Sequence, residues 1–329
     1  MINLWRNNPV FAPKEKGPNL AEKYVFPSGR QAITYCLTYS KLKREDRVAI
    51  PEWSSNCVIN AIGKVCTPIP FHEVLENRIK VSAVLLYDQW GWPNTTSKSL
   101  KKIEEITKCK ILIHDAVDSF PFKLNLRVPS INEEFVKKNG PKKIYTIFSM
   151  SKSLGLSSGG LLFFNNRGLM FKNFGKNNFE EKLQLKKLKD KNEYLSSFLK
   201  SENHFLEKEL NEWLELNDLF QAFEVEKRKR KINLNKVSNS KLALNWPAWM
   251  FSALDEGFLP GIVPFFRESS EHELKQKQNE LSIKHQIQSI QYHFNWSNNS
   301  LEPAYGKCLA IPTHGMVSDI DEIINTLES

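Results

Sequence analysis

The first half of the chain alternates short apolar runs with amphipathic stretches, and this pattern limits the possible folds more than any other feature. The runs end at proline, glycine, aspartate, serine or asparagine, and they cover residues 47–50, 81–87, 111–113, 144–148 and 160–164. Runs of this kind predict buried β-strands, and the stretches between them, such as 30–42 and 97–108, predict helices. Strand–helix–strand repetition predicts an α/β fold with a mostly parallel sheet covered on both faces.

The chain has 329 residues, 41% of them hydrophobic, which suits one large and one smaller domain. We place a large α/β domain at residues 1–235. Its last part, 167–235, is charged and helical, with aromatic residues at helical spacing that suit a core or a dimer contact: Phe198, Phe205, Trp213, Phe220 and Phe223. We expect a small α+β domain at 236–329, entered through an aromatic, loop-rich stretch at 244–266 and closed by one strand and one helix.

The composition excludes several classes of protein. No apolar run approaches the ~20 residues needed to span a bilayer, and the N-terminus lacks the apolar core of a signal peptide. We therefore expect a cytoplasmic protein without a membrane partner. The five cysteines form no Cys-x-x-Cys pair and predict reduced thiols. The seven histidines show no metal-site spacing, so no bound metal is predicted.

The formal net charge of +9 raises the question of a nucleic-acid partner. Much of the excess lies in lysine-rich helical stretches at 182–191 and 227–231, within segments that also carry acidic residues. Such stretches are typical of solvated helix faces, so we predict no nucleic-acid partner. The remaining positive charge could steer an anionic small substrate such as a phosphate or a nucleotide.

Lys152 is the first candidate for a chemical role. It closely follows the predicted strand 144–148 and lies among Ser149, Ser151 and Ser153, ahead of several glycines. A lysine at such a place sits at the floor of a cleft, where partial desolvation lowers the amine pKa, as a Schiff-base lysine requires. The neighbouring hydroxyls could donate hydrogen bonds to a phosphate. An ordinary loop lysine is the alternative that this segment alone leaves open.

Asp115 falls at the C-terminal end of the apolar run 111–113. A carboxylate there is costly unless a cation accompanies it. The protonated nitrogen of a pyridine ring is one such cation, and the carboxylate would keep that ring an electron sink. A helix N-cap aspartate is the commoner role at such a position, so the segment alone does not decide.

Two further segments could bind the same ligand. Ser28 and Gly29 open the amphipathic stretch that begins at Arg30, so free backbone N–H groups and the positive end of the helix dipole would face a phosphate there. Trp53 follows the predicted strand 47–50 and could stack on a planar ring. Simple helix capping by Ser28 and burial of Trp53 in a core are the alternatives.

Six segments of this kind follow one another in a definite order. They are Ser28-Gly29-Arg-Gln-Ala32, Ile50-Pro-Glu-Trp-Ser-Ser55, Tyr87-Asp-Gln-Trp-Gly-Trp-Pro93, Asp115-Ala-Val-Asp118, Phe148-Ser-Met-Ser-Lys152 with Ser158-Gly159-Gly160, and Cys308-Leu-Ala-Ile-Pro-Thr-His314. The order resembles that of fold-type I enzymes that use pyridoxal 5′-phosphate (PLP), and among them the DegT-type sugar aminotransferases. The ordered likeness covers roughly residues 24–165, with a weaker echo near the C-terminus.

The resemblance implies the aspartate-aminotransferase fold, with three layers and a mostly parallel sheet in the large domain, and PLP as cofactor. It implies Lys152 and Asp115 as the catalytic residues: Lys152 would carry PLP as a Schiff base and transfer protons, and Asp115 would face the ring nitrogen. The cofactor-binding residues implied by the matching segments are Ser28, Gly29, Arg30, Trp53, Asp115, Asp118, Ser149 and Lys152.

The resemblance also implies a reaction and its partners. It implies transfer of an amino group from glutamate or glutamine to a keto sugar, nucleotide-linked as in that family, by a homodimer. Trp90 and Arg267 are candidate substrate contacts, since aromatic faces suit a sugar ring and an arginine can pair with a phosphate. The aromatic residues of the segment 246–267 could line the substrate pocket together with Arg267, and the alternative for them is the core of the small domain. Another fold-type I reaction, a lyase or a decarboxylase, is the alternative function.

Asp118 departs from the family pattern, which has glutamine or histidine close to the phenolic oxygen of the cofactor. An anion there would repel a phenolate, so we expect Asp118 to point away or to be protonated. The sequence also lacks a recognisable Gly-x-Asn-x-Arg segment, through which a partner subunit often reaches the cofactor phosphate in that family. These departures favour a third alternative, a degenerate relative without catalytic activity.

Overall fold

The computed structural model describes residues 1–14, 25–94, 102, 109, 111–120, 143–156, 158–164, 212–266 and 271–329. Its larger sheet has seven strands: β1 (Val25–Phe26), β2 (Arg47–Ile50), β3 (Thr67–Pro70), β4 (Ala83–Tyr87), β5 (Ile111–Asp115), β6 (Lys143–Ser149) and β7 (Gly160–Phe164). The strand order is β1-β7-β6-β5-β4-β2-β3. β7 runs antiparallel to both of its neighbours, and every other pair is parallel. The predicted α/β fold with a mostly parallel sheet is confirmed.

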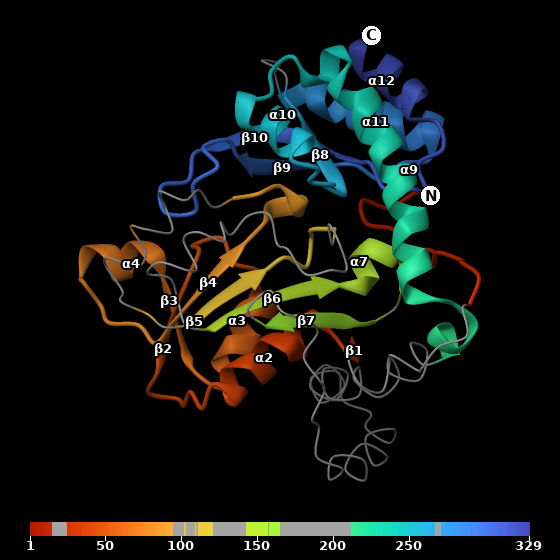
Figure 1. The fold of residues 1–329 in the computed structure, drawn as a ribbon. Helices are drawn as coiled ribbons and strands as arrows, with labels where there is room; N and C mark the ends of the chain where they lie inside the picture. Colours follow the sequence, from red (N-terminus) through yellow and green to blue (C-terminus); the bar gives the residue numbers. More distant parts are fainter. Residues whose placement is uncertain are drawn as a thin grey trace, which may run out of the picture.

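The central strands are buried on both faces, which explains why they appear in the sequence as continuous apolar runs. On one face, Leu85 and Ile113 pack with residues of α2 (Gly29–Tyr39) and α3 (Asn56–Gly63). On the other face, Leu86 and Leu112 pack with residues of the short helix α4 (Phe71–Glu76). Figure 1 shows α2 and α3 below the sheet and most of the C-terminal elements above it.

The carboxyl ends of three parallel strands meet at one edge of the sheet. The register pairs Tyr87 of β4 with Asp115 of β5, and Asp115 with Ile147 of β6. The short helix α7 (Met150–Leu154) follows β6 immediately, with Gly155 in the left-handed conformation at its end. Polar residues after these strands are therefore brought together, as expected where ligands bind to parallel sheets.

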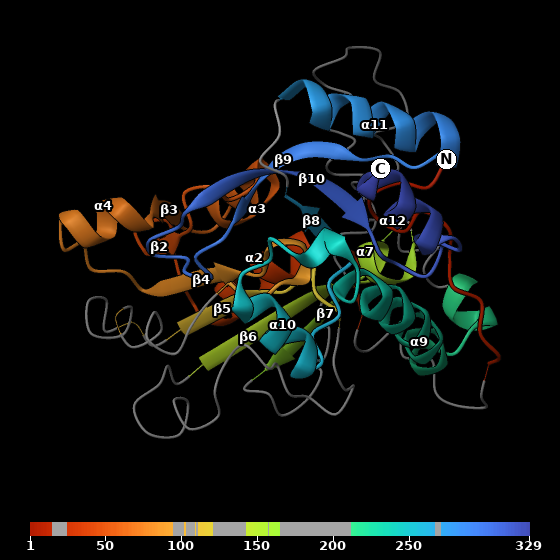
Figure 2. The ribbon, with the colours of Figure 1, turned by 90° about the horizontal axis from the view of Figure 1, so that it is seen from above.

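The C-terminal region (residues 239–329) forms a second sheet. It contains β8 (Ile262–Phe265), β9 (Ile290–Asn295) and β10 (Tyr305–Pro312), antiparallel in the order β8-β10-β9. Its helices are η4 (Lys241–Ala243), α10 (Ala248–Asp255), α11 (Glu271–His285) and α12 (Ile320–Glu328). The long helix α9 (Leu219–Ser238) contacts both α7 and α12, and so joins the two parts. Figures 1 and 2 show this region over one end of the large sheet, with the N-terminus beside it.

The segment 244–266, expected to be loop-rich, contains α10 and β8, because Met250 and Ala253 form a buried helical face that its prolines and aromatics obscure in the sequence. The domain boundary expected after residue 235 falls inside α9, and the division into two domains stays a prediction. The stretches 97–108 and 182–191 fall almost entirely outside the described residues, as do Phe198 and Phe205. None of the described helices is long and apolar enough to cross a membrane.

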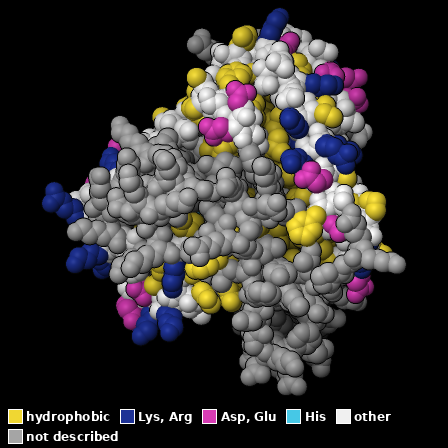
Figure 3. All heavy atoms as spheres, in the orientation of Figure 1, with side chains coloured by type: hydrophobic (Ala, Val, Ile, Leu, Met, Phe, Trp, Pro, Cys, Tyr) yellow, Lys and Arg dark blue, Asp and Glu magenta, His cyan; other side chains and the backbone are white. Residues whose placement is uncertain are grey.

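The basic stretch of α9 is only in part the solvated face that the sequence predicts. Arg228, Lys229 and Lys231 are exposed, and dark blue side chains gather over α9 in Figure 3. Arg230, in contrast, is 1% exposed and donates hydrogen bonds to Glu226, one helical turn earlier. The burial depends on tertiary partners, so the charge pattern of the sequence could not reveal it.

Candidate active site

A cavity of about 530 Å³ opens at the carboxyl ends of β4, β5 and β6. Every candidate catalytic, cofactor-binding or substrate residue that lies within the described residues lines this cavity: Ser28, Gly29, Arg30, Trp53, Trp90, Asp115, Asp118, Ser149 and Lys152. The remaining candidate, Arg267, lies outside the described residues. The C-terminal region closes one side of the cavity with Ile262, Ile290 and Tyr292. Residues up to 124 positions apart in the sequence, from Ser28 to Lys152, therefore line one cavity.

Lys152 lies on α7, and its side chain, 36% exposed, reaches the cavity. Its Nζ donates a hydrogen bond to Asp118 Oδ1 and lies 4.7 Å from the centre of the Trp5 ring. Burial alone would lower the pKa of this amine, but the charge and hydrogen bond of Asp118, with the charge of Asp115, outweigh burial and raise it. The expectation of a lowered pKa was wrong because it omitted these two carboxylates.

Asp118 points into the cavity, so the first of the two expectations for it, that it points away, was wrong. Its Oδ1 accepts from Lys152, and its Oδ2 accepts from the backbone N–H of Trp90 at 3.3 Å. A carboxylate and an ammonium group within hydrogen-bond distance form a charge-assisted hydrogen bond. The charge that seemed out of place in the sequence is thus balanced by Lys152 itself.

Asp115 is 3% exposed at the end of β5. Among the described residues, its side chain accepts one hydrogen bond, at 3.3 Å from the backbone N–H of Val117. Burial raises the pKa of this carboxyl to about 6, and the charge of Asp118 adds to the effect. A buried carboxylate with one long hydrogen bond favours a cationic partner in the cavity.

The N-terminus of α2 faces the same cavity. Ser28 caps the helix, since its Oγ accepts from Gln31 N at 3.3 Å, and Gly29 and Arg30 form the first turn. Gly160 of β7 lies directly against this turn: a Cβ there would come within 2.7 Å of the Ser28 backbone and 2.8 Å of Gly29 N. The amide groups of the turn, the Arg30 side chain and the hydroxyls of Ser149 and Ser158 offer donors for an anion.

Trp53 and Trp90 differ in their surroundings. Trp53 is 69% exposed at the cavity, with its ring edge-on to Tyr305 at 5.6 Å. Trp90 is 7% exposed and packs against Tyr292 and Phe294 of β9. Its backbone has a positive φ of 59°, uncommon for a tryptophan, within a turn that docks against the C-terminal region.

The lining of the cavity fits PLP. The ligand needs an amine for covalent attachment, an anion beside its protonated ring nitrogen and donors for its phosphate. Lys152 offers the first, Asp115 the second, and the start of α2 with Arg30 the third. The strongest indication that the cavity fits PLP is Asp115, because its buried carboxyl has no direct cationic hydrogen-bond partner among the described residues.

Other lining residues carried no signal in the sequence. Leu4 and Trp5 come from the N-terminal segment, and Ile290 and Tyr292 from β9. Three of the six residues of β9 are exposed, and polar residues interrupt its apolar ones, so no apolar run marks it. The aromatic residues of 246–266 that were considered as a substrate pocket do not line the cavity. Most pack in the core of the C-terminal region: Trp246, Phe258, Phe265 and Phe266 are at most 6% exposed.

Comparisons with known proteins agree with this geometry. A family model described as "Putative PLP-dependent aminotransferase" matches residues 17–327. No curated protein matches the chain in sequence.

Several solved structures are similar in fold. A "putative sugar aminotransferase" from Streptococcus pneumoniae in its PMP form has 14% identity and a TM-score of 0.54, with 98% of each chain covered. An aminotransferase from Streptoalloteichus hindustanus has 11% identity and a TM-score of 0.52, with 99% of this chain and 98% of that chain covered. A DegT DnrJ EryC1 StrS aminotransferase from Brucella abortus has 14% identity and a TM-score of 0.51, with coverages of 95% and 90%.

Proposed function

Because the chain belongs to the family of PLP-dependent aminotransferases, whose model matches residues 17–327, we propose that it transfers an amino group from glutamate or glutamine to a keto sugar. Membership of an aminotransferase family argues against the lyase, decarboxylase and non-catalytic alternatives. The observation that carries the proposal is the meeting of the Lys152 amine, the buried Asp115 carboxyl and the start of α2 in one cavity.

Lys152 has two tasks in this proposal. Bound PLP supplies an electron sink for the bonds next to the substrate nitrogen. Lys152 Nζ would attach the cofactor and, when free, would move a proton at the substrate carbon that bears the nitrogen, as general base and then as general acid. Asp118 orients Nζ through its hydrogen bond and, because it raises the pKa of the amine, favours a proton on it.

Asp115 and the start of α2 hold the two ends of the cofactor. Asp115 would keep the ring nitrogen protonated, because an ion pair with the carboxylate lowers the free energy of the charged ring nitrogen in a buried place. Ser28, Gly29, Arg30 and Ser149 bind the phosphate through amide, guanidinium and hydroxyl groups. Trp53, which lines the cavity, would offer its aromatic face to the ring.

A keto sugar suits the remaining surface of the cavity. Trp90 and Tyr292 pack together there and offer aromatic faces of the kind that bind sugar rings. The printed name of the Streptococcus pneumoniae relative, a "putative sugar aminotransferase", agrees with such a substrate. We retain Arg267 as a proposed partner for a substrate phosphate, although it lies outside the described residues.

Separate half-reactions test this function. Glutamate or glutamine should remove the visible absorbance band of the bound cofactor, and a nucleotide-linked keto sugar should restore it after the donor has been removed by gel filtration. The Lys152→Ala variant is the control and should show neither change. Restoration by aromatic or aliphatic 2-oxo acids, with no response to any keto sugar, would show that the proposed acceptor class is wrong.

We also propose that the protein is a homodimer with the cavity near the subunit boundary, as in the enzymes it resembles. Two aromatic side chains of the cavity, Trp53 and Tyr292, expose 69% and 53% of their surface, which a second subunit would cover. The aromatic stripe suggested from the sequence offers less: Trp213 and Phe223 are buried within the chain, and Phe220 is 37% exposed.

Sedimentation at micromolar concentration should give a particle of two chains. Trp53→Glu should shift the equilibrium towards monomer, because it places a charge on an apolar contact. Ile283→Glu, on the 81%-exposed outer side of α11, is a matched control that should leave the dimer intact. A wild-type protein that is monomeric under these conditions rules the dimer out.

A further inference from the structure

The N-terminal segment (residues 1–14) connects the C-terminal region with the helix that carries Lys152. At one end, Ile2 exchanges backbone hydrogen bonds with residues 286 and 288, and Asn3 O accepts from His314 Nε2 at 2.9 Å. At the other end, Val10 N donates to the carbonyl of Leu154 in α7 at 3.1 Å. Both ends are therefore held, and the residues between them have a defined course past the cavity.

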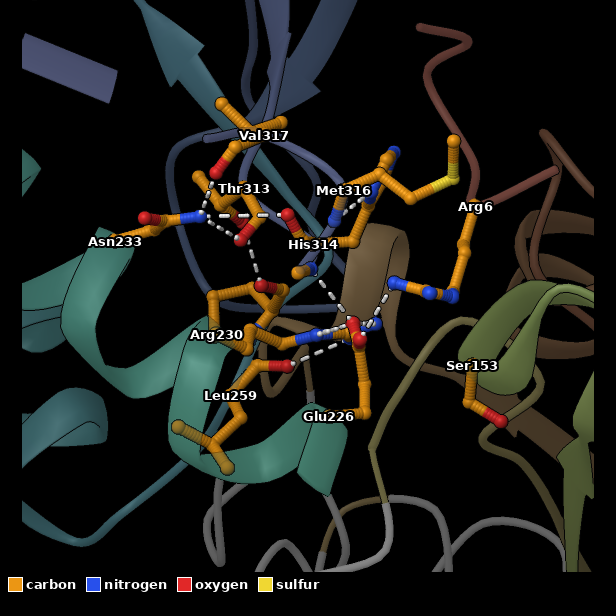
Figure 4. Close-up of polar contacts among 12 residues, drawn as sticks. Arg6, Ser153, Glu226, Arg230, Asn233, Leu259, Thr313, His314, Met316 and Val317 are labelled. Atoms are coloured by element: carbon orange, nitrogen blue, oxygen red, sulfur yellow. Dashed lines mark hydrogen bonds and ion pairs between the residues drawn. The ribbon is translucent and has the colours of Figure 1, made fainter. Parts of the chain in front are cut away.

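Arg6 adds a buried anchor in the middle of this segment. Its Nη1 donates to Glu226 Oε2 at 3.0 Å, and Glu226 is 0% exposed. The same carboxylate accepts from Arg230 and from the backbone N–H of Gly315, so it ties together the N-terminal segment, α9 and the C-terminal region. Figure 4 shows Arg6 and Arg230 converging on Glu226. Since Arg6 follows Trp5 directly, this ion pair also limits where Trp5 can lie.

The packing of the N-terminal segment against α7 further limits the position of Trp5. Gly155, at the end of α7, has a φ of +72° and lies against the Asn8 carbonyl: a Cβ there would come within 2.2 Å of that oxygen. The N-terminal segment and the end of α7 are thus in direct backbone contact. The position of Trp5 relative to Lys152 is therefore fixed by two contacts that flank it, the ion pair of Arg6 and the packing of Asn8 against Gly155.

Trp5 lines the cavity and presents its ring to Lys152. The distance of 4.7 Å from Nζ to the ring centre is within the ~6 Å range of a cation–π interaction. Nζ donates to Asp118 as well, so the ammonium group lies between a carboxylate and an aromatic face. An aromatic face attracts an ammonium group but has little affinity for the neutral amine.

We propose that Trp5 is a positioning residue for Lys152, which holds Nζ against Asp118 in its ammonium form. The proposal rests on the proposed role of Lys152 in attaching the cofactor. It assigns a part in the reaction to a segment that lies 147 residues from the lysine in the sequence and contributes no other reactive group.

The test compares Trp5→Leu and Trp5→Phe in the full-length protein. The quantity measured is the apparent pKa of the Lys152 amine, from the pH dependence of its acetylation in the cofactor-free chain, read by peptide mapping. Leucine fills much of the space without a π face, so the apparent pKa should fall by about 0.5–1. Phenylalanine keeps a weaker face and should give a smaller decrease. An alanine would admit water, which favours the ammonium form and hides the effect.

Leu4→Ala is the matched control, because Leu4 lines the same cavity from the same segment without an aromatic ring. It should leave the pKa of Lys152 unchanged. An unchanged pKa in a folded Trp5→Leu protein overturns the proposal. An equal decrease in Leu4→Ala also overturns it, because loss of packing would then be the cause.

A second readout uses PLP without turnover. Borohydride trapping of PLP on Lys152 should persist in Trp5→Leu and reach half of its maximum at a lower pH than in wild type, because a less basic amine loses its proton sooner. An unaltered pH profile contradicts the proposal. Neither readout depends on an amino donor or acceptor, so the positioning role and the proposed sugar substrate can fail separately.

Discussion

Replacement of Lys152 with alanine is expected to abolish covalent attachment of PLP while the chain stays folded. The Lys152 amine is the one lysine Nζ that the described lining of the cavity contains. Its side chain is 36% exposed, so its removal leaves little buried space unfilled. Borohydride reduction of the wild type, followed by peptide mapping, should place the pyridoxyl group on Lys152.

Lys152→Arg is the matched control for charge. A guanidinium group can keep the pairing with Asp118, but it cannot form the Schiff base because its pKa keeps it protonated. Both variants should therefore lose the label, and the arginine variant should keep the melting temperature of the wild type more closely. A label on a different lysine in the wild type would remove Lys152 from its proposed role.

The sequence revealed the central strands and the edge of the sheet that carries the site. Strands buried on both faces, such as β5, are continuous apolar runs, and the polar residues after them must gather at one edge when the strands are parallel. Asp115 and Lys152 could be recognised from this rule. β3, in contrast, reads Thr-Pro-Ile-Pro and resembles a turn, because proline is tolerated at the edge of a sheet where no further strand needs its N–H.

The rest of the site depends on tertiary contacts that no local pattern encodes. Trp5 faces Lys152 because the N-terminal segment is held in place. Arg6 forms an ion pair with Glu226, and the backbone of Ile2 forms hydrogen bonds with the C-terminal region. Tyr292 reaches the cavity from β9. The mixture of exposed and buried residues in this strand gives no alternating pattern from which the face carrying Tyr292 could be predicted. Asp118 was recognised as unusual, yet its partner could be identified only once α7 placed Lys152 beside it.

Replacement of Asp115 with asparagine is expected to leave PLP attached and to lower kcat by ~10²-fold or more, the scale seen when one primary electrostatic partner is removed. The side chain is 3% exposed and nearly isosteric with asparagine, so the fold should persist. Attachment through Lys152 needs no charge at Asp115. Catalysis does, because a neutral amide cannot hold the ring nitrogen protonated and the ring then withdraws electrons poorly.

Asp88→Asn provides the matched control, since it is the same substitution at the end of the neighbouring strand. Asp88 is 1% exposed, but its carboxylate pairs with His114 at 2.9 Å and accepts from Ser119 at 3.0 Å, away from the cavity lining. Its loss should lower the melting temperature with little effect on kcat, the reverse of the pattern at Asp115. The two variants are compared by single-turnover kinetics with the cofactor absorbance as signal. If the kcat of Asp115→Asn is within a few-fold of the wild-type value, the role of Asp115 is to accept the hydrogen bond from Val117 N, and another group must pair with the ring nitrogen.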